Sequence, residues 1–150
     1  MRLLVQRVSE ASVKIEGKIN GEINQGLLLF VGIGEDDSQE DIDWLVKKVT
    51  GLRIFSNDEG KMNLSGTDIN AEYLVISQFT LHASTKKGNR PSYIKAARPE
   101  QAIPLYESFI NQMKVVQSQK VASGIFGADM KVSLINDGPV TIWIDSKNKQ

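Results

Sequence analysis

The chain has 150 residues, of which 41% are hydrophobic and 24% are charged, and its formal net charge is zero. This composition excludes a disordered chain, and the length suits a single domain over residues 1–150. No apolar run approaches the roughly 20 residues of a membrane span, and the N-terminus lacks an apolar signal core, which predicts a cytoplasmic protein without membrane partners. The absence of cysteine excludes disulfides, thiolate zinc sites and cysteine nucleophiles.

The first part of the chain predicts strands. Alternating apolar residues over 3–8 are typical of a strand, and residues 13–23 predict a hairpin that turns at Gly17 and Lys18. The continuous apolar run over 26–33 indicates a central strand that is covered on both faces.

A helix is predicted from Ser38, which is spaced from Asp41 as in a capping box, to Gly51. A short strand at 53–55 and a polar loop at 56–68 are expected to follow. Acidic residues gather around the start of the helix with no Lys or Arg among them, and we expect them to form a solvated face. They are Glu35, Asp36, Asp37, Glu40, Asp41 and Asp43.

Residues 73–81 predict a buried strand, because they are rich in β-forming apolar residues and carry no charge. Ser77, Gln78 and Thr80 interrupt the apolar run. A buried hydroxyl or amide group costs free energy unless it is hydrogen-bonded, so polar residues here suggest a functional site.

A basic segment follows this strand directly. No acidic residue lies between Tyr73 and Pro99, whereas five basic residues do. They are Lys86, Lys87, Arg90, Lys95 and Arg98. A phosphate-binding role and an ordinary solvated face are about equally compatible with this pattern.

The C-terminal third predicts a second helix over 99–117, with Ile103 and Tyr106 on its core-facing stripe. Two alternating strands, 131–135 and 140–145, flank Asn136-Asp137-Gly138-Pro139, which predicts a tight hairpin turn. The expected fold is a single α+β domain of mostly antiparallel, barrel-like sheet with two main helices.

Few side chains suit acid–base catalysis. His82 is the only histidine, so multi-histidine metal sites are excluded. In a strand Thr80 and His82 would share a face, which permits a threonine nucleophile paired with a histidine base. A structural or surface role is the more frequent one for a lone histidine, and Asp129 is better explained as a turn residue.

Four motifs in order resemble the D-aminoacyl-tRNA deacylase family. They are SQFTL at 77–81, KKGNRPS at 86–92, FGADM at 126–130 and NDGPVT at 136–141. The segments QRVSEASV and GLLLFVGIG are also similar to the family, so the resemblance covers essentially the whole chain.

The resemblance implies hydrolysis of the ester that joins a D-amino acid, or glycine mischarged on tRNA(Ala), to the 3′ end of tRNA. It implies a homodimer in which Gly138 and Pro139, joined by a cis bond, reach into the partner's pocket and exclude L-aminoacyl groups. Phe126 and Met130 would bind the substrate as well. No cofactor, metal or DNA partner is implied.

Ser77, Gln78, Phe79 and Thr80 match the family's catalytic wall, where main-chain amides hold the aminoacyl group. The resemblance leaves two mechanisms open, with either Thr80 as nucleophile or the terminal 2′-hydroxyl of the tRNA assisting water. The scarcity of acid–base side chains fits the second better.

Lys86, Lys87 and Arg90 would bind tRNA phosphates, which gives affinity without sequence specificity. Two other classes of function stay open on the residues alone. One is a threonine-nucleophile hydrolase of a small ester or amide, and the other is a non-catalytic RNA-binding module.

Overall fold

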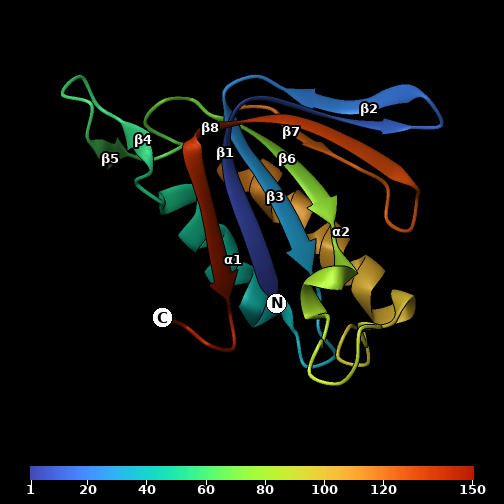
Figure 1. Cartoon of the computed structure of the whole chain (residues 1–150). Coiled ribbons are helices and arrows are strands. Elements are labelled where there is room, and N and C mark those ends of the chain that lie inside the picture. The colour runs from blue at the N-terminus through green and yellow to red at the C-terminus, as the bar shows by residue number, and fades with distance from the viewer.

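Two long antiparallel strands, β1 (Arg2–Ile15) and β8 (Met130–Asp145), pair along their lengths in the computed structural model, which describes residues 1–150 (Figure 1). The first half of β1 pairs also with β3 (Gly26–Gly32), and its second half pairs with β2 (Lys18–Ile23). The sheet thereby bends from one layer into another and becomes nearly barrel-like.

The far side of β3 continues the sheet with parallel strands. The strand β6 (Glu72–Ser77) pairs with β3, and the short strand β7 (Val121–Ser123) pairs with β6. The sheet is therefore mixed, with its antiparallel part built around β1.

Both faces of β3 are buried, which explains its uninterrupted apolar sequence. Leu27 and Leu29 point toward the helices α1 (Gln39–Gly51) and α2 (Pro99–Val116), which lie on the same side of the sheet (Figure 1). Leu28 points to the opposite face and packs in a second cluster under the bent parts of β1, β2 and β8. The result is an α+β domain, as the sequence predicted.

The prediction of a hairpin turn at residues 136–139 was wrong. Gln6 pairs with Thr141 and Val8 pairs with Asn136, so residues 137–140 form a bulge opposite Arg7 within one continuous strand. Turn-forming residues indicate that the chain leaves a regular ladder, but they do not distinguish a reversal from a bulge.

The strand predicted at 73–81 ends early. β6 stops at Ser77, and Phe79–His82 form a 3₁₀ turn, η1. Phe79 is therefore not a core residue but is 53% exposed. The alternation argument that placed Thr80 and His82 on one face does not apply to this turn.

Smaller differences lie in the connections and in the second helix. The short strand predicted at 53–55 is observed as β4 (Phe55–Ser56), and the predicted polar loop contains its partner β5 (Met62–Leu64). This hairpin projects from the body of the molecule (Figure 1). In α2, Tyr106 is buried, but Ile103 is exposed.

Both helices begin as expected. Ser38 caps α1, where the capping box with Asp41 is present, and Pro99 lies in the first turn of α2. Neither helix combines the length and the apolar character needed to cross a membrane.

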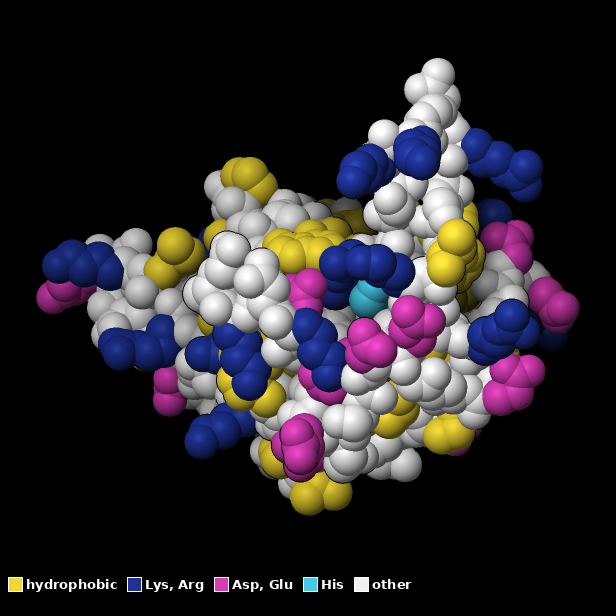
Figure 2. All heavy atoms as spheres, turned by 90° about the horizontal axis from the view of Figure 1, so that it is seen from below, with side chains coloured by type: hydrophobic (Ala, Val, Ile, Leu, Met, Phe, Trp, Pro, Cys, Tyr) yellow, Lys and Arg dark blue, Asp and Glu magenta, His cyan; other side chains and the backbone are white.

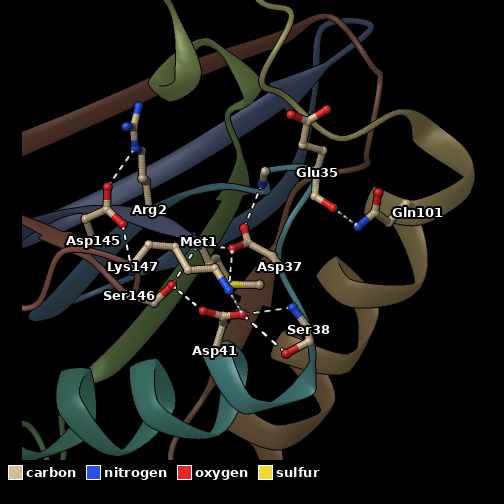
Figure 3. A network of polar contacts seen from close by, with 11 residues as sticks. Met1, Arg2, Glu35, Asp37, Ser38, Asp41, Gln101, Asp145, Ser146 and Lys147 are labelled. Atoms are coloured by element: carbon tan, nitrogen blue, oxygen red, sulfur yellow. Dashed lines mark hydrogen bonds and ion pairs between the residues drawn. The ribbon is translucent and has the colours of Figure 1, made fainter.

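Two carboxylates of the acidic run are buried, contrary to the expectation of a solvated face. The amino group of Met1 donates to the Asp37 carboxylate and, at 2.7 Å, to Ser146 Oγ (Figure 3). Ser146 Oγ donates to Asp41 Oδ1 at 2.6 Å, and Lys147 Nζ donates to Asp41 Oδ2 at 2.9 Å. These contacts connect the start of β1, the start of α1 and the segment that follows β8.

We predict that Asp41→Asn lowers the free energy of unfolding by about 1.5–3 kcal/mol near neutral pH, as for other hydrogen bonds to charged groups. Burial alone would raise the pKa of Asp41, but hydrogen bonds from Ser146 and Lys147 lower it to about 2. Because this pKa is depressed in the folded state, the stabilisation is present above about pH 4 and is lost as the pH falls toward 2.

Urea unfolding of both proteins between pH 7 and pH 2 measures this difference. Glu40→Gln is the matched control, since Glu40 is exposed on the same helical turn. A difference that persists unchanged down to pH 2 would assign the effect to packing rather than to charge.

Candidate active site

A cavity of about 280 Å³ opens where β6 ends. One wall comes from the end of β6 and the start of η1, and the other comes from the segment that leads into β8. The lining residues are Ile76, Ser77, Gln78, Phe79, Phe126, Gly127, Ala128, Asp129, Met130 and Val132. The structure therefore gathers five of the site residues expected from the sequence: Ser77, Gln78, Phe79, Phe126 and Met130.

Main-chain hydrogen bonds fix the wall formed by η1. The amide of Gln78 donates to the carbonyl of Val31 at 2.7 Å, which keeps the segment attached to β3 after β6 ends. The amide of Leu81 then donates back to the Gln78 carbonyl at 3.2 Å, and Arg2 Nη1 donates to the Leu81 carbonyl at 2.9 Å. The first N–H groups of such a turn have no partner within the turn and are available to a ligand.

Thr80 follows the cavity wall and is oriented by its neighbour. The side-chain amide of Gln78 donates to the Thr80 hydroxyl oxygen. His82 is buried, its Nε2 has no hydrogen-bond partner, and burial lowers its pKa. The structural role expected for His82 is consistent with these contacts, which show no Thr80–His82 pair.

The opposite wall is supported from behind by α2. The Tyr106 hydroxyl donates to the Val75 carbonyl at 3.0 Å, and its ring lies 5.9 Å from the ring of Phe126. Burial raises the pKa of Tyr106 above its usual range, so the phenol stays protonated and keeps donating. Tyr106 thus connects β6 with the segment that carries Phe126.

The cavity has little titratable chemistry of its own. Asp129 is the one acidic residue among its lining residues, and no basic residue is present there. The Asp129 carboxylate is exposed and accepts a hydrogen bond from Lys131 Nζ at 2.8 Å, as suits a turn residue. Chemistry in this cavity therefore depends on oriented main-chain groups, on neutral side chains and on the substrate itself.

Gly138 and Pro139 lie elsewhere, in the bulge of β8. Their peptide bond is cis, as the resemblance implied, and Gly138 has a φ of +124°. Neither residue lines the cavity of its own chain. The φ of Gly138 strains any residue with a side chain, and a Cβ at Gly138 would also lie 2.9 Å from Val140 Cγ2 and 2.7 Å from Arg7 Nη2, so a substitution there forces its neighbours to shift.

The bulge is held by Arg7, which the sequence analysis did not single out. Arg7 is only 9% exposed, and it donates from Nη1 to the Ile54 carbonyl at 2.7 Å and from Nε to the Asp137 carbonyl at 3.1 Å. Asn136 closes the bulge by donating to the carbonyls of Arg7 and Val140, both at 3.0 Å. An arginine at a core-facing position of the alternating strand β1 was the signal that could have revealed this role.

The basic residues Lys86, Lys87 and Arg90 are exposed on a loop that stands out from the molecule (Figure 2). Reciprocal main-chain hydrogen bonds of 2.8 and 2.9 Å between Ser84 and Ser92 close this loop. None of its residues lines the cavity.

Comparisons with known proteins find the same family that the sequence motifs resemble. The family model described as D-Tyr-tRNA(Tyr) deacylase matches residues 4–145. The chain belongs to this family. Two similar proteins, from Flavobacterium psychrophilum at 63% identity and from Bacteroides thetaiotaomicron at 60%, are both named D-aminoacyl-tRNA deacylase, and each match covers the full length of both chains. The chain is therefore an enzyme of this class, a deacylase that acts on D-aminoacyl-tRNA.

Solved structures share the fold of this deacylase. The structure titled "c-Myc DNA Unwinding Element Binding Protein" is 38% identical with a TM-score of 0.92, covering 97% of this chain and 98% of the other. A probable eukaryotic D-amino acid tRNA deacylase matches with a TM-score of 0.82 at 16% identity, covering 95% and 97% of the two chains. The second likeness concerns the fold alone.

We predict that Arg7→Met destabilises this deacylase by about 1–3 kcal/mol, because the buried Ile54 carbonyl and the partly buried Asp137 carbonyl lose their donor. Urea unfolding measures the loss. Arg53→Met is the matched control, since Arg53 donates to the Asn63 carbonyl at an exposed site. Equal losses in the two variants would contradict a special role for Arg7 in holding the bulge.

Proposed function

We propose that the enzyme is a chiral proofreader that hydrolyses D-aminoacyl esters of tRNA, and the glycyl ester on tRNA(Ala), while sparing L-aminoacyl esters. One observation carries this proposal, namely a cavity that Ser77, Gln78 and Phe79 line and that lacks a catalytic acid–base pair. Recognition by main-chain atoms acts on the α-carbon and is indifferent to the side chain. A proofreader of chirality needs this property, because its L-aminoacyl competitors carry every kind of side chain.

In the proposed mechanism, N–H groups at the start of η1 stabilise the oxyanion that forms when water attacks the ester carbonyl. Ser77, Gln78, Phe79 and Thr80 form the wall that positions the aminoacyl group. The terminal 2′-hydroxyl of the tRNA assists the water, and the 3′-oxygen leaves with a proton. Neutral, oriented donors suit a site in which no charged side chain except Asp129 is present.

Selection against L-amino acids is assigned to a second copy of the chain. Gly138 and Pro139 are exposed, and they contribute nothing to the cavity of their own chain. Their carbonyls can contact a substrate only if the bulge enters the cavity of a partner, as in a homodimer. The ordered contacts of Arg7 and Asn136 present the bulge in one conformation for this purpose.

The loop with Lys86, Lys87 and Arg90 is assigned to the phosphates of the tRNA. These side chains are free of ion pairs with protein carboxylates, which leaves their charge available for phosphates. We place the enzyme in the cytoplasm, where aminoacylated tRNA is the substrate.

The test is deacylation of D-Tyr-tRNA, L-Tyr-tRNA and Gly-tRNA(Ala) by purified protein. We expect rapid hydrolysis of the first and third substrates and release from the second at the spontaneous rate. Comparable hydrolysis of L-Tyr-tRNA would contradict chiral selection, while leaving the esterase activity intact.

A second prediction concerns Thr80. If the substrate's 2′-hydroxyl assists water, Thr80→Ala keeps most of the turnover of D-Tyr-tRNA, whereas loss of a covalent nucleophile costs several orders of magnitude. Single-turnover rates of wild type and Thr80→Ala measure the effect, with circular dichroism as the control for folding. A collapse of the rate in a folded variant would restore the threonine-nucleophile mechanism.

A further inference from the structure

An exposed pair of aromatic rings lies at the rim of the cavity. The rings of Phe79 and Tyr93 meet edge to face, with their centroids 5.0 Å apart. Phe79 is 53% exposed and Tyr93 is 38% exposed, although rings of this size are usually buried in a domain core. Phe79 also lines the cavity, so this pair extends the binding surface outward from it.

Tyr93 is fixed by the main chain on both sides. The hydrogen bonds between Ser84 and Ser92 close the basic loop immediately before it, and the amide of Ala96 donates to the Tyr93 carbonyl at 3.0 Å. The amide of Ala97 then donates to the Ile33 carbonyl at 2.9 Å, which ties the segment to the end of β3. Tyr93 is therefore a preorganised exposed ring rather than part of a flexible tip.

The basic residues near the Phe79–Tyr93 pair indicate which kind of ligand it binds. The loop that Ser84 and Ser92 close carries Lys86, Lys87 and Arg90, and the chain from Tyr73 to Pro99 contains no acidic residue. A ring surface next to uncompensated positive charge is the combination that binds single-stranded nucleic acid, with bases on the rings and phosphates on the cations.

We propose that Phe79 and Tyr93 form a stacking surface for an unpaired base of the tRNA 3′ end, next to the terminal nucleoside whose ester occupies the cavity. This inference rests on the proposed function. Phe79 lines the cavity, and the basic loop ends at Ser92, directly before Tyr93. A nucleotide that follows this path places its base on the rings and its phosphate toward the loop.

The experiment compares Tyr93→Leu, Tyr93→Phe and wild type on two substrates, D-Tyr-tRNA and 3′-O-D-tyrosyl adenosine, which has no preceding nucleotide. Loss of base stacking is expected to raise KM for D-Tyr-tRNA roughly 5- to 150-fold in Tyr93→Leu with little change in kcat. The same variant keeps its KM for the adenosine ester, and Tyr93→Phe restores the wild-type KM for the tRNA. Ile94→Ala is the control, because Ile94 is an exposed apolar neighbour without a ring.

Three results would overturn the inference: equal losses on both substrates, no loss on the tRNA, or a changed oligomeric state of Tyr93→Leu in analytical ultracentrifugation. The last would show that the rings contact a second copy of the chain. Binding of uncharged tRNA, measured by fluorescence anisotropy, gives a readout that does not depend on hydrolysis. A wild type that binds tRNA through Tyr93 but hydrolyses neither ester would refute the proposed function and keep the stacking surface.

Discussion

The continuous pairing of β1 with β8 is the constraint on which the rest of the structure depends. Because both strands bend together, their first and second halves cover different faces of the same sheet, and two separate apolar clusters form around β3. The start of β8 also brings Met130 to the cavity, while its middle presents the bulge at Gly138. The pairing of β1 with β8 therefore positions both the cavity and the bulge that enters the partner's cavity in the proposed dimer.

The distribution of charge follows from this arrangement. The enzyme gathers ionic contacts at the end of the sheet, where Asp37 and Asp41 bind the Met1 amino group, Ser146 and Lys147, and it leaves the cavity almost neutral. Hydrogen-bonded ion pairs join the ends of β1, α1 and β8, whereas the cavity holds only neutral residues and Asp129. Structural and chemical tasks are thus separated in space.

Much of this fold was predictable, because hydrophobic periodicity and capping residues are local signals. The apolar run of β3, the helix start at Ser38 and the second helix from Pro99 were all indicated by such signals and are confirmed. The errors at Gly138 and Phe79 have one cause. Whether a chain reverses, bulges or tightens into a 3₁₀ turn depends on distant partners, and here these are the Arg7 side chain and the Val31 carbonyl. The motifs predicted which residues form the site, but not that five of them line one cavity while Gly138 and Pro139 lie apart from it in the bulge.

The cavity lies between the end of β6 and the start of β8, so its shape depends on the register of these strands as well as on its side chains. A single substitution in the lining leaves this register in place. Deletion of one residue between Met130 and Asn136 is different, because it turns every following side chain of that strand to the opposite face. The bulge would then no longer meet Arg7. Length variation should therefore be far less tolerated in this strand than amino-acid replacement, and divergent members of the family are expected to preserve its spacing.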